Sequence, residues 1–532
     1  MVSAAHPLAV EAGLEVLRRG GSAVDAAVAV QLVLGFVEAP ETGIGGGGFL
    51  LHFDASSRAL QAYDGRETAP AAAGADRFTL LGRPAPRWFA IPSGRAVGVP
   101  GLVAMLGLAH QQHGRLPWAE LVAPAIQLAE QGVPMPERLR RQSRRDPSLR
   151  LYGDIRRHFV APAGDEQSRL RNPEYAATLR LLAERGPAAF YTGEIAAGLV
   201  ERAGRRRPWP SDLELVDLAG YAPRERAPVC GPYREWTVCG VPPPSSGGIA
   251  LLQMLGMLER FPLAELGPDS IEAMHLLVEA QRLAFADRER FIGDPDFVEV
   301  PVGALLDSAY LRRRSILIEP RVALDAAPPG EPRSGHAVGS DPPRDAPVAG
   351  GTSHFTIVDG DGNVAALTSS IEAPFGSRMM SGGFLLNNQL TDFTFDPHDG
   401  DRPHPNAVAP GKRPRSSMAP VIVFDADGEV RLALGARGGP RIIPYVARTL
   451  VAVLDWGLGI QEAIVLPNFV HADGRVELER GTLLPARAAE FTARGHRVRE
   501  AELASGLHGI ERTASGWRGG ADPRLDGVAR GD

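Results

Sequence analysis

The stretch VAGGTSHFTIVDGDGN, residues 348–363, joins a segment that cannot build a core to a run with the pattern of a β-strand. Residues 324–351, which lead into it, are rich in Pro, Gly, Asp, Arg and Ala and predict a mobile linker. Residues 353–371 predict a hairpin, because two runs of β-branched and apolar residues are joined at 359–363. Two glycines and Thr352 stand where linker and strand meet.

Cleavage of the chain before Thr352 is one reason for such a junction. A threonine that becomes N-terminal carries a nucleophilic hydroxyl and a free α-amine, whose unperturbed pKa of about 7.7 to 8.0 suits a general base. Self-cleavage needs a flexible segment before the threonine, an unhindered carbonyl at Gly351 and a rigid strand after it, and residues 324–370 show this pattern. The alternative is a plain linker that enters a strand, and the pattern alone leaves it open.

Composition describes an ordinary globular protein. The chain has 532 residues, 44% of them hydrophobic and 23% charged, so a sizeable core is available. A net charge of −6 gives no global field that favours nucleic acid or anionic lipid. Two arginine-rich runs, 138–150 and 205–207, are interpreted as solvated helix faces or loops.

The two cysteines, Cys230 and Cys239, lie on either side of a turn that we expect at Gly231-Pro232. Two short apolar runs flank this turn, so the cysteines can face each other across a hairpin. Two cysteines make neither a disulfide framework nor a complete zinc site. We therefore predict buried thiols.

Helical periodicity predicts helices over 6–19, 23–37, 249–258 and 271–291, and most of 102–318 reads as helical. The apolar helix 23–37 carries Asp25, is too short to span a bilayer and is read as a core helix. As given, the chain shows no secretion signal, so we expect a cytoplasmic protein, or a periplasmic one if an upstream leader precedes it. Strands bracketed by helices at both ends of the chain suggest two stacked sheets between helical layers.

Two further patterns are weighed and set aside. GIGGGG at 43–48 follows a helix and precedes a strand, the reverse of a dinucleotide-binding loop, so we expect these glycines to allow close backbone packing. FDPHDGDRPHP at 395–405 has no zinc or calcium spacing and predicts an exposed loop near a site. We predict no metal and no cofactor.

Residues 350–393 read GGTSHFTIVDGDGNVAALTSSIEAPFGSRMMSGGFLLNNQLTDF, and ten motifs stand in order along nearly the whole chain. They are GGSAVDAAVAV, TGIGGGGFLL, DGRETAP, VGVPGLVA, GYAPRERAPV, VPPPSSGGI, EAQRLAFADRERFIGDPDF, NAVAPGKRPRSSMAPVIV, GARGGPRII and GGADPRLDG. In these residues the chain resembles the gamma-glutamyltransferases, a family of N-terminal nucleophile hydrolases.

The resemblance implies an α+β fold, the four-layer αββα sandwich of N-terminal nucleophile hydrolases. It implies a helix-rich large subunit, residues 1–351, that ends in the linker 324–351, and a small subunit, residues 352–532, that begins with the catalytic threonine. Both chains would come from one precursor by autocleavage, remain together as a heterodimer and form one αββα domain.

The resemblance also implies the reaction. Thr352 would attack the Gly351 carbonyl to cut the chain, and would then take a γ-glutamyl group from glutathione or another γ-glutamyl amide. The acyl group would pass to water or to an amino acid or peptide. Ser370 matches the position of a hydroxyl that hydrogen-bonds the nucleophile. Gly438 and Gly439 match the oxyanion position, although an ordinary turn would use the same glycines.

The family's substrate clamp has counterparts in this sequence. Arg66, with Ser416 and Ser417, matches the group that holds the substrate α-carboxylate, a task suited to a guanidinium fork, and a surface arginine is the alternative. Glu372, Gln389 and Asp392 would hold the α-ammonium. Ser370 replaces the threonine of many members, and the 392–416 loop looks shorter than a lid and lacks a tyrosine. These departures leave the ratio of hydrolysis to transfer open.

Two alternatives remain from the sequence. One is a related acylase, such as a cephalosporin or glutaryl acylase or a γ-polyglutamate depolymerase. The other is an unprocessed, non-catalytic binding protein with the same fold.

Overall fold

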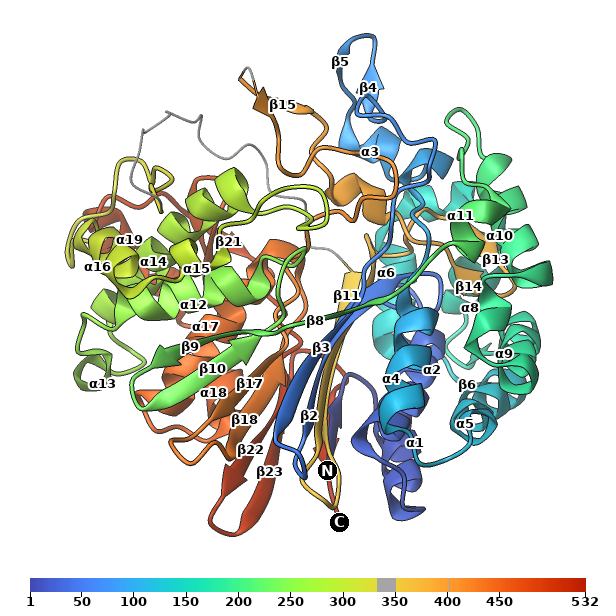
Figure 1. Ribbon diagram of the computed structural model, residues 1–532, viewed down its shortest axis with the longest axis horizontal. Coiled ribbons are helices and arrows are strands. Elements are labelled where there is room, and N and C mark those ends of the chain that lie inside the picture. Colours follow the sequence, from blue (N-terminus) through green and yellow to red (C-terminus); the bar gives the residue numbers. More distant parts are fainter. Residues whose placement is uncertain (333–350, 401) are drawn as a thin grey trace.

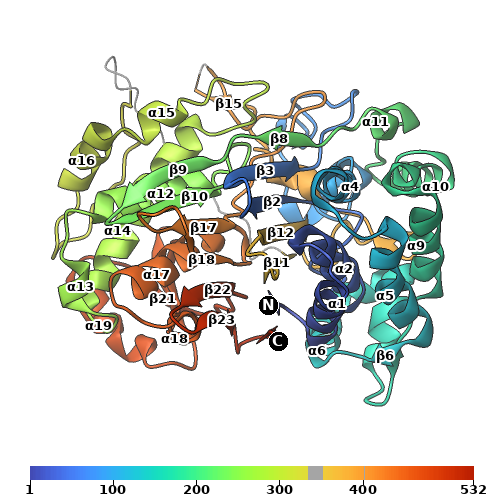
Figure 2. The ribbon, with the colours of Figure 1, turned by 60° about the horizontal axis from the view of Figure 1, so that its bottom comes forward.

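The computed structural model describes residues 1–332, 351–400 and 402–532 (Figure 1). Two large antiparallel sheets lie face to face in the middle of the molecule, and helices cover both outer sides (Figures 1 and 2). The first sheet has the order β24 (Val528–Arg530), β1 (Val2–Ala4), β11 (Gly351–Val358), β12 (Val364–Glu372), β2 (Gly47–Asp54), β3 (Ala59–Gly65) and β8 (Arg224–Arg226). The second has the order β23 (Gly516–Ala521), β22 (His508–Thr513), β18 (Val430–Gly435), β17 (Val421–Phe424), β10 (Trp236–Gly240) and β9 (Val229–Tyr233).

An apolar layer fills the space between the sheets. It includes Phe49 and Leu51 of β2, Val364 of β12, and Ile422 and Ala433 of β17 and β18, all buried. Alternate residues of each strand supply this layer, because successive side chains of a strand point to opposite faces. The sheets are therefore held by burial of their facing side chains, and β11 and β12 lie against β18.

Helices from the first half of the chain cover the outer face of the first sheet. The most buried of them is α2 (Ala23–Val37), every residue of which is shielded from solvent. The Ser22 side chain accepts a hydrogen bond from the Asp25 N–H, and the Asp25 carboxylate accepts one from the Ser22 N–H, so a capping box starts this helix. Its neighbours are α1 (Pro7–Arg18), α4 (Leu102–His113), α5 (Trp118–Gln131), α6 (Glu137–Arg145) and α9 (Pro173–Arg185).

A second helical group covers the outer face of the other sheet. Its longest member, α14 (Ile271–Phe291), has the bounds that its periodicity predicts. Within the described ranges, no helix combines the length and the apolar character needed to cross a bilayer. The other main members are α12 (Gly247–Leu258), α16 (Ser308–Ile316), α17 (Ile442–Leu454), α18 (Ile460–Val465) and α19 (Ala488–Ala493).

The two parts of the chain on either side of residue 351 share the first sheet. β11 lies between β1 and β12, and β1 also pairs with β24, so the N-terminal strand lies beside the strand that begins at Gly351 and the C-terminal strand lies one position further out. The predicted hairpin is confirmed as β11 and β12. Of the predicted linker, residues 333–350 lie outside the described residues.

The first part of that linker is docked, which corrects the prediction for residues 324–332. The Leu324 N–H donates to Glu279, and the Gly330 N–H donates to Asp287, both on α14. Composition missed this because two backbone donors find buried carboxylates on a helix that is remote in sequence.

The two cysteines face each other across a hairpin, as the sequence suggests, but the prediction of buried thiols is wrong. Cys230 and Cys239 are directly opposite on β9 and β10 and form a disulfide. The turn lies at residues 234–235 rather than at Gly231-Pro232, with Arg234 in the left-handed region at φ 54°. With the turn at 234–235, Cys230 and Cys239 are opposite each other in the strand pairing, whereas a turn at Gly231-Pro232 would not pair them.

Candidate active site

The Gly351–Thr352 peptide lies where the β11–β12 ladder becomes irregular. Gly351 is opposite Glu372, whereas Thr352 is opposite Ser370, so the register shifts between the two residues. Irregular pairing of this kind re-aims side chains and recurs beside active sites. Glu372 adopts a positive φ of 78°, a strained conformation for a side-chain-bearing residue.

The Ser370 hydroxyl connects the two halves of this peptide. Ser370 Oγ donates to the Gly351 carbonyl oxygen and accepts from Thr352 Oγ1, which lies 3.3 Å away. It also accepts the Glu372 N–H at 2.8 Å. All of these groups are buried, so the hydroxyl and the carbonyl that it links are held out of bulk water.

The glycine run 43–48 packs against this strand, which confirms the prediction of close backbone contact. A Cβ on Gly46 would lie 2.1 Å from the Ser370 carbonyl oxygen, and one on Gly48 would lie 2.6 Å from that of Thr368. Only glycine fits at such separations. The run therefore braces β12 directly behind Ser370.

A buried ionic cluster lies on the other side of Thr352, and sequence reasoning missed it. The Thr352 N–H donates to Glu41 Oε2 at 3.2 Å, and Arg437 Nη2 donates to the same oxygen at 2.5 Å. Arg138 of α6 binds both Glu38 and Glu41. The interpretation of 138–150 as a solvated face is thus wrong for Arg138, and also for the buried Arg140.

Burial and ion pairing set the charges in this cluster. Burial acts to raise the pKa of Glu41, but Arg437 and Arg138 outweigh it and hold that pKa below its ordinary value. Burial raises the pKa of Glu38 despite the attraction of Arg138. Arg437 follows β18 and Glu41 follows α2, so two distant segments meet at the amide of Thr352.

Arg66 is buried rather than superficial, which excludes the alternative of a surface arginine. Its Nε donates to the Pro414 carbonyl at 3.0 Å, and its Nη2 donates to the Arg415 carbonyl and to Asp392. Its Nη1 makes no hydrogen bond within the described residues and lies 3.7 Å from Glu67. Burial raises the pKa of Glu67 to about 8, so this carboxyl is mostly protonated at neutral pH and leaves the Nη1 donors available.

The side chains of Gln389, Asp392 and Glu372 lie near Arg66. Gln389 Nε2 donates to Asp392 Oδ2 at 2.7 Å, while the buried Gln389 Oε1 has no partner among the described residues. Burial, and then the charge of Asp392, raise the pKa of Glu372 to about 7. Asn388 donates to the Glu372 carboxylate and orients it. An amide oxygen without a partner among the described residues thus lies beside two carboxylates.

Ser416 and Ser417 are held by the proline-rich segment 242–248. The Ser246 N–H and hydroxyl both donate to the Ser416 carbonyl, at 2.9 and 2.7 Å. Arg288 of α14 donates to the Ser417 hydroxyl at 2.9 Å and to the Ser246 hydroxyl at 2.8 Å. Arg288, which sequence reasoning did not single out, thus adds a buried cation behind the serine pair.

Gly438 and Gly439 follow Arg437 at the start of a short 3-10 helix (Gly439–Arg441). Their φ values of 121° and 60° are conformations that favour glycine. Neither N–H group donates a hydrogen bond within the described part of the chain. Because Arg437 and Thr352 share one oxygen of Glu41, these glycines lie in the segment that reaches Thr352.

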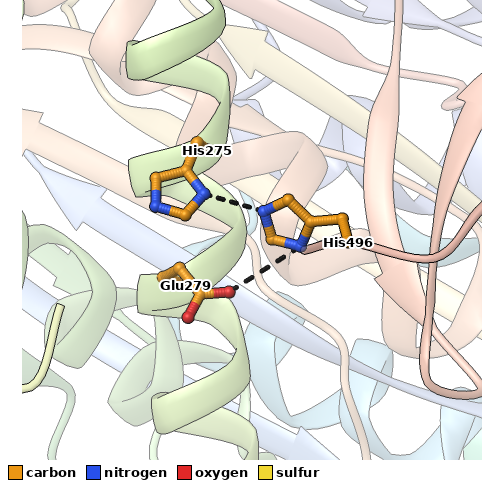
Figure 3. A group of neighbouring side chains, drawn as sticks. All are labelled: His275, Glu279 and His496. Carbon is orange, nitrogen blue, oxygen red and sulfur yellow. Dashed lines mark hydrogen bonds and ion pairs between the residues drawn. The ribbon is translucent and has the colours of Figure 1, made fainter. Parts of the chain in front are cut away.

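A group of side chains that could hold a metal lies elsewhere, on the second helical layer (Figure 3). Among the described residues only His275, Glu279 and His496 come together in this way, all buried. His275 Nδ1 and His496 Nε2 are 2.7 Å apart, a hydrogen-bond distance, whereas two ligands of a tetrahedral zinc ion lie about 3.3 Å apart. These groups already bind one another. His398 and the other residues of 395–405 form no such group within the described residues.

Comparison with known proteins gives a consistent result. The family described as Gamma-glutamyltranspeptidase matches residues 9–531. The glutathione hydrolase proenzyme of Bacillus subtilis strain 168 is 36% identical over 479 residues, which cover 88% of this chain and 80% of that protein. The acylase ACY 1 proenzyme of Pseudomonas sp. strain SE83 is 34% identical over 552 residues, covering 99% of this chain and 92% of that protein.

Among solved structures, the cephalosporin acylase from Bacillus halodurans superimposes with a TM-score of 0.84 at 27% identity, covering 99% of this chain and 94% of that one. The family match spans nearly the whole chain, and the two proenzymes are 34–36% identical to it over 80–92% of their own length. The chain therefore belongs to the gamma-glutamyltranspeptidase family.

Proposed function

We propose that this protein is a gamma-glutamyltranspeptidase that acts on glutathione and other γ-glutamyl amides and is made as a proenzyme cut between Gly351 and Thr352. One observation carries the proposal: Ser370 Oγ joins the Thr352 hydroxyl to the Gly351 carbonyl. The family match and the proenzyme relatives support it.

Processing begins at this contact. Thr352 Oγ1 attacks the carbonyl carbon of Gly351 while the Ser370 hydroxyl donates to the carbonyl oxygen, where negative charge develops. The C–N bond breaks, the nitrogen takes a proton, and the two residues are joined by an ester. Water then hydrolyses the ester, which leaves a carboxylate on Gly351 and a free α-amine on Thr352.

Catalysis uses the same atoms in a second role. The α-amine accepts the hydroxyl proton, Oγ1 attacks the γ-carbonyl of the donor, and the amine of the donor leaves with a proton. The N–H groups of Gly438 and Gly439 would hold the oxyanion. Water or the amino group of an acceptor then attacks the γ-glutamyl ester, and Thr352 regains its hydroxyl proton.

The charges around Arg66 support selection of a glutamyl group. Arg66 Nη1, with Ser416 and Ser417, would bind the α-carboxylate, and Gln389 Oε1, Glu372 and Asp392 would bind the α-ammonium. A donor without the ammonium would leave the buried Gln389 Oε1 without a partner and would bring no positive charge to the carboxylates of Glu372 and Asp392, which costs affinity.

The layered arrangement supports a further assignment, the αββα sandwich of the N-terminal nucleophile hydrolases. Residues 1–351 and 352–532 would be its two chains after cleavage. Because β11 pairs with β1 and β12, and α14 packs beside residues of the second half, both chains would contribute to one domain and stay associated.

Two measurements test the activity. Denaturing gel electrophoresis with N-terminal sequencing should show two chains, one of which begins Thr-Ser-His-Phe. The processed enzyme should release p-nitroaniline from γ-glutamyl-p-nitroanilide. The ACY 1 relatives favour a second candidate, an acylase, so cleavage of glutaryl-7-aminocephalosporanic acid without release of p-nitroaniline would replace the first proposal. A single uncut chain with no activity would leave a binding protein.

The disulfide bears on location. Disulfides persist in oxidising compartments and are rare in the cytosol, so Cys230–Cys239 favours a periplasmic or extracellular protein over the cytoplasmic expectation. Thiol alkylation of the protein in freshly lysed cells, before reduction, tests this. Two reactive thiols would return the assignment to the cytoplasm.

A further inference from the structure

We propose that Glu41 is a positioning residue for the α-amine of processed Thr352, and that Arg437 and Arg138 offset its charge so that the amine can work as a base. This inference rests on the proposed function. Glu41 follows α2 and is almost fully buried. None of the ten sequence motifs that the chain shares with its family includes it.

The geometry aims one carboxylate oxygen at the future base. Glu41 Oε2 accepts the Thr352 N–H at 3.2 Å. It also lies 3.1 Å from the position that a Cβ on Gly351 would occupy, so it flanks the scissile peptide. After cleavage the same nitrogen carries more protons, and one N–H bond to Glu41 would fix the direction of the remaining lone pair. A free amine without such a partner would rotate about the N–Cα bond.

The charge balance prevents this carboxylate from trapping the amine as ammonium. An unpaired carboxylate next to an amine raises the amine pKa by favouring the charged form. Here Glu41 Oε2 binds Arg437, and Glu41 Oε1 binds Arg138 at 2.6 Å. Glu38 completes the cluster by pairing with Arg138 and accepting from the Ser353 hydroxyl at 3.0 Å. Two carboxylates face two guanidinium groups, so the cluster can orient the amine without adding net charge beside it.

His508, Tyr445 and Asp522 lie around the cluster and do not change charge near pH 7. Burial lowers the pKa of His508 on β22 to about 4 and raises that of Tyr445 on α17, so both are neutral. Burial opposes ionisation of Asp522, but Arg524 keeps the pKa of that carboxyl low. Asp526 also lies near Arg138. Glu372, at the end of β12, does titrate near 7, so the test below uses saturating donor, which pairs with it.

The test is the position of the acid limb of the kcat–pH profile in processed enzyme, with γ-glutamyl-p-nitroanilide at saturation. Glu41→Gln keeps an acceptor oxygen but leaves Arg437 without its carboxylate and Arg138 with Glu38 alone, so the amine pKa falls and the acid limb moves down by about 1 pH unit. Arg437→Met leaves the carboxylate with one arginine fewer, so the limb moves up by a similar amount. Opposite displacements support the proposal, whereas displacements in one direction, or none, overturn it.

Two controls separate this inference from its surroundings. Glu279→Gln changes a buried glutamate that pairs with Arg282 on the far helical layer, and its acid limb should stay in place. Thr352→Ala should be uncut and inactive. An active Thr352→Ala variant would contradict the proposed function itself. If Thr352→Ala is inactive but the acid limbs of Glu41→Gln and Arg437→Met stay in place, only the role of Glu41 is contradicted.

The inference can still be tested if the Glu41→Gln chain is not cut before Thr352. If Glu41→Gln is not processed, Arg437→Met and Arg138→Met carry the test, since each removes one cation from the same carboxylate and keeps the bond to Thr352. Upward displacement of the acid limb in both supports the role of Glu41, and an unchanged limb in either overturns it. Glu41→Ala, which removes the acceptor, should lower kcat at least tenfold with little change in KM.

Discussion

Two buried polar clusters differ in what their groups face. In the cluster at the start of β11, Ser370 and Glu41 both bond to the peptide between Gly351 and Thr352. In the histidine cluster of α14, the groups bond to one another or to a fixed carbonyl: His275 to His496 and to the Glu319 carbonyl, each within 2.8 Å.

The groups of the histidine cluster form their hydrogen bonds with other protein groups, without a ligand from outside the protein. Because a carbonyl only accepts, His275 Nε2 donates to Glu319, so His275 Nδ1 accepts from His496. Glu279 accepts from Arg282 and from the Leu324 N–H. Burial lowers the pKa of His496 to about 3, which keeps it neutral. The comparison teaches that a buried group of histidines does not by itself identify a reaction site. Several polar side chains that all bond to one peptide, as Ser370 and Glu41 do at Gly351–Thr352, are a better indication.

Replacing Thr352 gives the largest expected effect. Thr352→Ala removes the hydroxyl proposed to attack Gly351, so the chain should stay at full length and turnover should fall by at least about 10⁴-fold. Gel electrophoresis and release of p-nitroaniline measure the two losses. Thr352→Ser keeps a hydroxyl and is the matched control, which should still process. Processing in Thr352→Ala would show that the convergence at Ser370 is not catalytic.

Replacing Arg66 comes next. Arg66→Met removes the donors predicted for the α-carboxylate and leaves Asp392 without its buried partner, so kcat/KM should fall about 30- to 1,000-fold, equivalent to about 2–4 kcal/mol. Processing should continue, because Arg66 does not touch Gly351 or Thr352. Arg77→Met, which breaks a partly buried pair with Asp212 elsewhere, is the control and should keep kcat/KM. Equal losses in both variants would indicate destabilisation rather than lost binding.

The sequence predicted the groups of this site that lie in recognisable motifs. Thr352 stood out because a linker meets a strand there, and the glycines at 43–48 because no other residue allows such contact. The periodicity of 23–37 predicted α2. These signals are local, because a linker that meets a strand, a glycine run and a periodic face each depend on adjacent residues.

The parts that the sequence did not reveal depend on contacts between distant residues. Glu41 and Thr352 are separated by 311 positions, and nothing near Glu41 marks it as a partner. Arg138 lies in a run of arginines that resembles a solvated face, and only packing beside Glu38 and Glu41 buries it. The disulfide was hidden by a turn placed at the wrong dipeptide. Pairing across the fold, rather than residue type, decided each case.

The pKa of Glu372 gives a smaller, pH-dependent effect. Burial and the charge of Asp392 raise this pKa to about 7, and the carboxylate form is needed for the substrate ammonium. The kcat/KM for γ-glutamyl-p-nitroanilide should therefore rise as pH increases through about 7, since kcat/KM reports groups of the free enzyme.

Asp392→Asn tests that cause. The variant removes the neighbouring charge, so the pKa of Glu372 falls and the acid limb of kcat/KM moves to lower pH, together with a lower plateau. Glutaryl-p-nitroanilide has no α-ammonium and is the matched control donor, whose profile should not follow Glu372. An acid limb that stays in place in Asp392→Asn would assign it to another group.

The smallest effect on activity should come from the histidine cluster, where His496 of the second half meets α14 of the first. His496→Ala leaves His275 Nδ1 without its donor and opens a small cavity, so we expect a loss of about 1–3 kcal/mol of stability, seen as a lower Tm. The kcat of processed enzyme at 25 °C should remain within about twofold, because surrounding packing still holds α14 and the active site lies elsewhere. Adding Zn²⁺ to the wild-type protein should leave Tm unchanged, because the two histidines already satisfy each other. A Tm that rises with Zn²⁺ in the wild type but not in His496→Ala would show that the histidine cluster binds a metal. The cluster would then have an outside partner, and its difference from the cluster at Thr352 would no longer hold.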